Sequence, residues 1–97
     1  MSYKVNLPQR LRREIGSWNL PDYVMVEVYL RLRERLAESP STSLVRISEP
    51  WDGMAFVFEL IDPLNRLRSF QFLFHVLYGQ DEETLYVTHG KMRLSHG

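Results

Sequence analysis

The sequence predicts an α+β fold in which a helical hairpin packs on one face of an antiparallel sheet. In the first forty residues, apolar side chains recur every three to four positions, which is the period of an amphipathic helix. From about residue 44 they alternate instead, which is the period of a half-buried strand. With 97 residues and no internal repeat, the chain is expected to form a single domain over residues 1–97.

The N-terminal part predicts one short strand, residues 3–7, and two helices, residues 8–17 and 21–39. The letters Asn-Leu-Pro precede both helices, so Asn6 and Asn19 are expected to act as N-caps before a proline in the first turn. Gly16 is a plausible end of the first helix, and Pro40 stops the second. Because few residues join the two helices, they should form an antiparallel hairpin.

The first half of the second helix is apolar almost all round. Such a helix is either buried on two sides or offers a surface to a partner. We expect a partner surface here, used by an antagonist protein or by a second copy in a homodimer. Its residues are Tyr23, Met25, Val26 and Leu30.

The remainder predicts strands over residues 44–48, 54–61, 69–78 and 84–89, separated by turn clusters, so the overall order is of the β-α-α-β-β-β type. The third of these segments alternates sharply. Phe70, Phe72 and Phe74 share one side, which should face the helices. Gln71 and His75 share the other, which should be the open face of the sheet.

Composition excludes several classes of protein. No window approaches the length of a membrane span, and no cysteine is present to form a disulfide or a thiolate ligand. The N-terminus has no signal-peptide pattern, so a cytoplasmic location is expected, without membrane association. Ten of the twelve cations are arginine, which binds phosphate or carboxylate with two hydrogen bonds. This bias is equally consistent with solvated helix surfaces or with contact to RNA or an acidic protein.

The C-terminal segment places a histidine and cations at the end of a strand. Histidine can serve as a general base or acid near neutral pH, and cations stabilise negative charge that develops on a bound group. His89 is the leading acid or base, with Lys91 as its catalytic partner and Arg93 as a phosphate contact. A solvated strand end is the alternative interpretation. Further substrate-binding candidates are Arg46, Arg68, Gln71 and His75.

Strand alternation complicates this site. Leu85, Val87 and His89 share one parity, so an unbroken strand would aim His89 at the helices. A bulge or kink at Gly90 would redirect it. His75 lies on the open face, as substrate binding requires, but a half-buried structural histidine is the alternative. Histidine and carboxylate spacing supports no metal site, and no cofactor is expected.

The order of elements resembles the RelE/ParE superfamily of bacterial toxins, and most nearly its HigB-like, or phage Gp49-like, branch. That branch has a "W-E-L-R" strand, then "Y-R-V-L-Y", a polar hairpin and "L-L-H-G-F-x-K-K". The corresponding segments here are Phe58-Glu59-Leu60, Phe70-Gln71-Phe72-Leu73-Phe74, Asp81-Glu82-Glu83 and Tyr86-Val87-Thr88-His89-Gly90-Lys91-Met92-Arg93.

The resemblance implies a small cytosolic toxin neutralised by a cognate antitoxin and able to cleave mRNA, commonly on the ribosome. Two alternatives stay open: a ParE-like inhibitor of DNA gyrase that is not an enzyme, and a catalytically silent interaction module. The chain departs from the family at Gln71, where an arginine usually helps to hold phosphate. Arg68, just before the strand, is the residue that could take its place.

Overall fold

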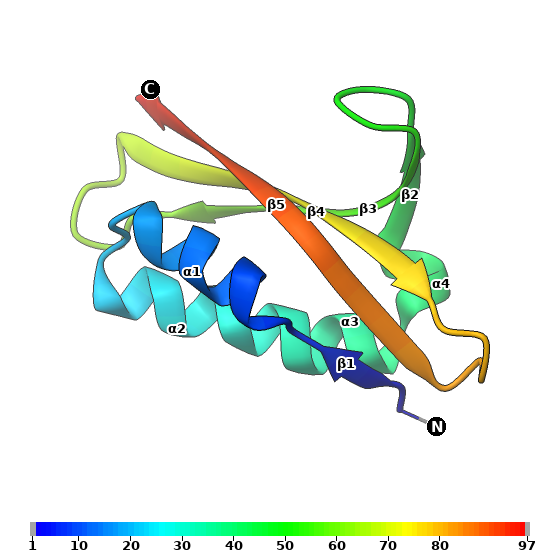
Figure 1. The fold of residues 1–97 in the computed structure, drawn as a ribbon. Coiled ribbons are helices and arrows are strands. Elements are labelled where there is room, and N and C mark those ends of the chain that lie inside the picture. The colour runs from blue at the N-terminus through cyan, green and yellow to red at the C-terminus, as the bar shows by residue number, and fades with distance from the viewer. Residues whose placement is uncertain (1, 97) are drawn as a thin grey trace.

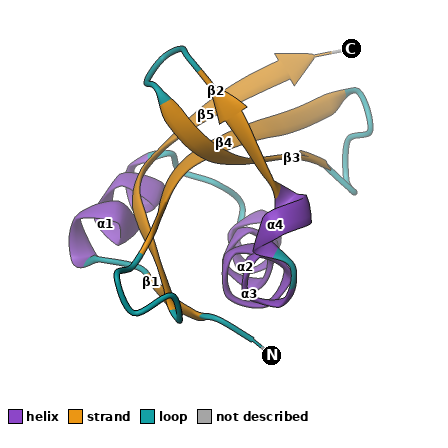
Figure 2. Cartoon of the chain, turned by 90° about the vertical axis from the view of Figure 1, so that its right-hand side faces the viewer, coloured by secondary structure: helices purple, strands orange, loops and turns teal. Residues whose placement is uncertain are grey.

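Residues 2–96, which the computed structural model describes, form a five-stranded sheet with the helices on one face (Figures 1 and 2). The helices are α1 (Gln9–Ser17), α2 (Asp22–Leu30), α3 (Leu36–Glu38) and α4 (Pro40–Ser43). A π-helical turn over Arg31–Arg35 joins α2 to α3 without a break. The strands are β1 (Lys4–Asn6), β2 (Leu44–Ile47), β3 (Gly53–Ile61), β4 (Arg68–Tyr78) and β5 (Thr84–His96).

The predicted α+β architecture is confirmed, with two corrections to the sheet. Its strand order is β1-β5-β4-β3-β2. Four strands follow the helices, in agreement with the four predicted segments and one more than the β-α-α-β-β-β order contains. All neighbours are antiparallel except β1 and β5, which are parallel. A parallel pair needs a crossover connection, and the helices and strands between Asn6 and Thr84 supply it.

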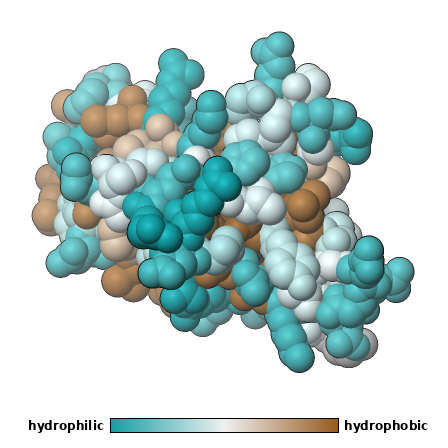
Figure 3. Space-filling model, in the orientation of Figure 1, coloured by the Kyte–Doolittle hydropathy of each residue, from teal (hydrophilic) through white to brown (hydrophobic). Residues whose placement is uncertain are grey.

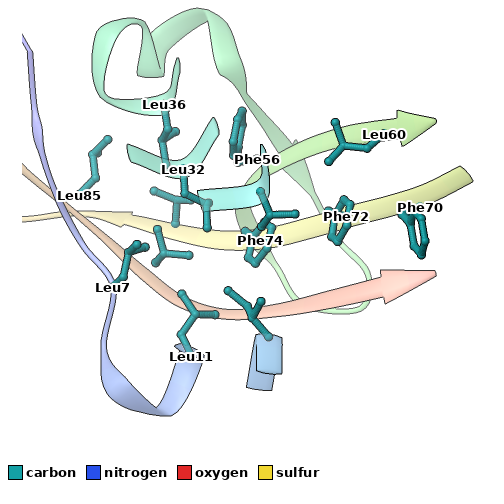
Figure 4. Packing of buried hydrophobic residues seen from close by; sticks show 14 of the residues in the cluster. Leu7, Leu11, Leu32, Leu36, Phe56, Leu60, Phe70, Phe72, Phe74 and Leu85 are labelled. Atoms are coloured by element: carbon teal, nitrogen blue, oxygen red, sulfur yellow. The ribbon is translucent and has the colours of Figure 1, made fainter. Parts of the chain in front are cut away.

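The core lies between the helices and one face of the sheet (Figure 4). Phe70, Phe72 and Phe74 point into it from β4, as the alternation predicts, and all three are buried. Each fully buried aromatic side chain of this size stabilises the fold by about 1.5–3 kcal/mol relative to exposure. The helices meet them with Leu11, Ile15, Val24, Val28, Leu32 and Leu36.

The expected asparagine caps are wrong. The residue before α1 is Pro8 and the one before α2 is Pro21, and neither helix start has a side-chain cap. Asn19 instead adopts a left-handed backbone conformation, with φ of 54°. Asparagine tolerates that conformation better than most residues, so Asn19 makes the turn between the helices rather than starting the second. The first helix continues one residue past Gly16, to Ser17.

A buried carboxylate ties the β3–β4 turn to α2. Asp62 is only 1% exposed. It accepts hydrogen bonds from the Tyr23 hydroxyl at 2.8 Å, the Leu64 N–H at 2.9 Å and the Arg68 guanidinium at 2.6 and 2.9 Å. The Tyr23 bond, helped by Leu64 and Arg68 and opposed by burial, holds the pKa of Asp62 below its usual value.

This network predicts a loss of stability in acid. Because the folded-state pKa is lowered, the contribution of Asp62 is complete above its unfolded pKa, about 3.9 for aspartate, and is lost as pH falls through the folded value. An Asp62→Asn variant should be less stable than wild type at neutral pH, and the difference should shrink on acidification. Urea unfolding between neutral and acidic pH measures this difference. A gap that stays constant with pH would show that the charge of Asp62 contributes nothing.

Candidate active site on the open face of the sheet

The face of the sheet opposite the helices carries the residues that the sequence nominates for chemistry. On β4, Gln71, Leu73 and His75 point away from the core, in register with Glu59, Val57 and Ala55 of β3. His75 therefore lies on the open face, as predicted. It is half-buried between its strand neighbours.

A β-bulge at Thr88 brings His89 to the same face. His75 pairs with His89, but the next residue, Val76, pairs with Val87, so Thr88 is an extra residue in β5. A bulge shifts the alternation by one, which turns His89 away from the helices although Leu85 and Val87 point toward them. A break was expected at Gly90, and it lies at Thr88 instead.

Gly90 serves another purpose: it permits close packing. A Cβ at this position would lie 2.5 and 2.6 Å from ring atoms of Phe74 and 3.3 Å from the Trp18 ring. Its backbone N–H donates to the Glu14 carboxylate at 2.9 Å, which attaches α1 to β5 two residues beyond the bulge. Residue 90 is therefore a glycine because the core side of the strand has no room for a side chain.

The two histidines form a compact cluster with Thr88 and Trp51. The imidazole rings stack with centroids 4.9 Å apart and an interplanar angle of 24°. Thr88 Oγ1 lies 2.5 Å from Nδ1 of His75 and 3.0 Å from Nδ1 of His89. Trp51, from the β2–β3 loop, contacts both rings edge-on, at centroid distances of 5.4 and 4.5 Å. The loop aromatic therefore covers one side of the histidine pair.

Burial of His75 favours its neutral form, which can act as a base. Desolvation in the cluster, followed by repulsion from His89, lowers the pKa of His75 below its ordinary value. A neutral imidazole at pH 7 can accept a proton. Nε1 of Trp51 is also buried, and it has no hydrogen-bond partner among residues 2–96.

Two cations extend the cluster along β5. Lys91 pairs across the sheet with Leu73 and Arg93 pairs with Gln71, so both lie on the open face and both are exposed. They border a shallow hollow of about 310 Å³ whose floor includes Val57 and Leu73. The histidines and the cations thus share one face of the sheet, on the neighbouring strands β4 and β5.

Gln71 lies in this region but its amide is engaged. Its Nε2 donates to the Glu59 carboxylate at 3.0 Å, and Glu59 lies directly opposite it on β3. The position where the resembling family has an arginine therefore presents a neutral amide bonded to an acid. Gln71 lies next to Arg93 and can contact a ligand there only through its remaining polar groups.

Arg68 and Arg46 are not part of this group. Arg68 has the same strand parity as Phe70, places its guanidinium over that ring at 5.2 Å and is held by Asp62. It therefore does not replace the missing arginine. Arg46 pairs with Met54 on β2, where its exposed side chain lies 3.6 Å from Asp52.

Within residues 2–96, no three histidine, aspartate or glutamate side chains are grouped to hold a metal ion. None of the helices in this part of the chain is long and apolar enough to cross a bilayer. The groups that the open face does present are two imidazoles, a hydroxyl and two cations.

Three residues of this region were not singled out from the sequence: Trp51, Thr88 and Glu59. Trp51 comes from a turn, where no periodicity indicates which way a side chain points. The bulge at Thr88, in contrast, could have been predicted from the sequence pattern around it. Lys91 and Arg93 share the parity of Val87, so an unbroken strand would have turned two cations toward the core. That conflict locates a bulge between Val87 and Lys91.

The fold is similar to that of a chain in a solved structure, while no protein-family model and no curated protein sequence matches the chain. The similar chain belongs to the crystal structure of the toxin–antitoxin complex RelBE2 from Mycobacterium tuberculosis. The TM-score is 0.59 with 14% sequence identity, and the alignment covers 100% of both chains. At this identity the comparison shows that the two chains share the RelE-like fold from end to end.

Proposed function

We propose that this chain is the toxin component of a type II toxin–antitoxin system and that it cleaves mRNA without a metal. The observation that supports the activity is the bulge at Thr88, which puts His89 beside His75 and in line with Lys91 and Arg93. The observation that supports the toxin role is the shared fold with a chain of a toxin–antitoxin complex. The placement in the HigB-like branch and the cytoplasmic location remain predictions from the sequence.

The proposed reaction uses the RNA's own 2′-hydroxyl as nucleophile. His75, neutral because its pKa is lowered, accepts the proton from that hydroxyl as the 2′-oxygen bonds to the adjacent phosphorus. The bond from phosphorus to the 5′-oxygen breaks, and His89 donates a proton to that oxygen. The products are a 2′,3′-cyclic phosphate and a 5′-hydroxyl.

Lys91 and Arg93 stabilise the charge that builds on the phosphoryl oxygens. Both are exposed and sit along the hollow beside the histidines, where a phosphate can reach them. Preorganised cations act most strongly on the charge that develops in the transition state. Trp51 would then limit access of water to one side of the histidine pair.

The test has a cellular and a chemical part. Induction of the wild-type chain in bacteria should arrest growth, and the RNA extracted from those cells should carry new 5′-hydroxyl ends within mRNA. Sequencing of ligated 5′-hydroxyl ends measures them. Normal growth together with intact mRNA, on and off ribosomes, would exclude the nuclease function.

A catalytically silent interaction module, or a gyrase inhibitor of the ParE kind, is the second candidate. Two observations favour it: Trp51 covers one side of both imidazoles, and Gln71 is bonded to Glu59 where an arginine is expected. The gyrase inhibitor predicts growth arrest with intact mRNA, whereas the silent module predicts neither growth arrest nor cleavage. A supercoiling assay then separates gyrase inhibition from mere association.

The proposed antitoxin or homodimer surface on α2 predicts an assembly that one substitution breaks. Val26 is 59% exposed and Leu30 is 43% exposed, and together with Tyr29 they border a shallow apolar hollow. Val26→Glu should convert an assembled species to a monomer, because it places a charge in the apolar contact. Light scattering after size-exclusion chromatography measures the mass.

The matched control for this prediction is Leu64→Glu, since Leu64 is 81% exposed but lies on the β3–β4 turn. That variant should assemble like wild type. A wild-type chain that is monomeric and does not associate with an antitoxin would contradict the surface.

A further inference from the structure

The outer edge of β5 is unpaired along most of its length. The strand has 13 residues, but β1 pairs with it only at Thr84, Leu85 and Tyr86, while β4 occupies the other side throughout. From Val87 to His96, no strand within residues 2–96 lies on the outer side. In Figure 1 the C-terminal end of β5 reaches beyond α1.

The backbone of this edge presents hydrogen-bonding groups in a regular array. The N–H of Gly90 points outward, because it donates to Glu14 of α1 rather than to β4. In an antiparallel pair, alternate residues direct both backbone groups away from the partner strand. Met92 and Leu94 have the same parity as Gly90 in the β4 register, so their N–H and C=O groups point outward as well.

Side chains on the two sides of this edge differ in character. Lys91 and Arg93 project on the open face and are exposed. Met92 and Leu94 project on the opposite face, where Leu94 is 43% exposed although it is a large apolar residue. The edge therefore offers cations on one side and apolar surface on the other, in strict alternation.

We propose that β5, from Lys91 to Leu94, binds an extended segment of a different polypeptide in which acidic and apolar residues alternate. That segment adds to the sheet as a sixth strand, and its backbone forms hydrogen bonds with the outward N–H and C=O groups of Met92 and Leu94. Its acidic side chains face Lys91 and Arg93, and its apolar side chains cover Leu94. A second copy of this chain is a poor occupant, because paired β5 edges would set Lys91 and Arg93 of one copy against the same cations of the other.

The proposal rests on the proposed function in one respect: the polypeptide is taken to be the neutralising partner. A bound acidic strand would occupy Lys91 and Arg93 and so remove the cations from the phosphate site. Figure 3 shows largely hydrophilic side chains with separate hydrophobic patches on the side of the molecule that carries α1 and β5. This pattern suits a polar strand contact better than a broad apolar interface.

Binding is tested with a short peptide that contains Val-Glu-Val-Glu-Val, added to the ¹⁵N-labelled full chain and followed by NMR. The amide signals of residues 91–96 should shift in a saturable way, and less strongly at high salt. The same sequence with lysine in place of glutamate should not bind. Absence of saturable shifts at millimolar peptide, or shifts confined to α2, would overturn the proposal.

Backbone pairing is tested by N-methylation of the peptide. In an antiparallel strand, methyl groups on the alternate amides that face β5 should abolish binding, while methyl groups on the other amides should leave it intact. Equal effects of the two methylation patterns would exclude strand addition. This arm uses only the wild-type protein, so it does not depend on any variant that fails to fold.

The matched protein variants are Leu94→Pro and Leu94→Val. Proline removes the outward N–H of residue 94 without removing a bond to β4, whereas valine retains both the N–H and an apolar side chain. Leu94→Pro should weaken peptide binding by about tenfold or more, and Leu94→Val should change it little. RNA cleavage is assayed separately: if cleavage is absent and the peptide still binds, the enzyme function fails and this surface stands.

Discussion

Replacing His89 and Lys91 together with alanine should lower the rate of RNA cleavage by about 10²- to 10⁴-fold or more. The loss of a positioned acid or base alone accounts for that range. Lys91 acts on the same transition state, so its loss should not add in full to that of His89. The rate of appearance of 5′-hydroxyl ends on a defined RNA, with enzyme in excess, measures the change directly.

The matched control is His96→Ala. His96 lies on the same strand, but it is exposed at its end and pairs with Arg68, away from the histidine pair. This variant should cleave RNA like wild type. If the His89→Ala/Lys91→Ala variant keeps the wild-type rate while remaining folded by circular dichroism, the open-face cluster is not the active site.

The direction of the pH dependence follows from His75. As the base, His75 must be neutral, so the acidic limb of kcat/KM should rise as pH increases through its lowered pKa. His75→Gln should lose that acidic limb and retain a slower, flatter profile. A wild-type rate that falls with pH over the same interval would assign His75 another role.

The second large effect concerns stability. Gly90→Ala should lower the free energy of unfolding by about 1–3 kcal/mol, because a Cβ would lie 2.5 Å from a Phe74 ring carbon in a closely packed core. Phe74 is fully buried and stacks against Phe72, so its ring has little room to move. Urea denaturation measures the change through the midpoint at constant slope.

Two further variants sharpen this prediction. Gly16→Ala is the control: nothing lies within 4 Å of a Cβ there, and alanine in a helix is favoured by about 0.5–1 kcal/mol, so it should stabilise. The Gly90→Ala/Phe74→Leu double variant should lose less stability than the sum of the single changes, since the smaller side chain makes room. Additive losses would place the cause outside the Gly90–Phe74 contact.

The alternation of β4 was enough to predict the layer arrangement, because a strand between a core and solvent has only two faces to assign. It correctly placed the phenylalanines under the helices and His75 on the open face. The helix starts were predicted to within one residue, but the cap expected at Asn19 was wrong. Asn19 has two favourable uses, as a cap and in a left-handed turn, and the tertiary connection between α1 and α2 selects the second.

The candidate site was predictable only in part. Lys91 and Arg93 could be placed close to His89, after the end of the predicted strand. The role of Arg68 could not be predicted, because it depends on Asp62 and Tyr23, which are distant or turn residues. The length of β5 was also underestimated: it continues to His96, past the expected end at residue 89. The side chains after residue 89 still alternate between the two faces of the sheet. Most of them are polar, so the spacing of apolar residues does not reveal the strand.

The Thr88 hydroxyl has a further consequence for the two imidazoles. It has a single hydrogen, so if it donates to Nδ1 of one ring it accepts from Nδ1–H of the other. The two neutral rings then hold opposite tautomers, and their outer nitrogens differ: one has a free lone pair and the other has a hydrogen. When one outer nitrogen gains a proton and the other loses one, a proton transfer through the threonine oxygen returns both rings to the neutral form with their tautomers exchanged, and exchange with water then resets them. A single bulged residue thus sets the direction of the histidines and also links their proton states.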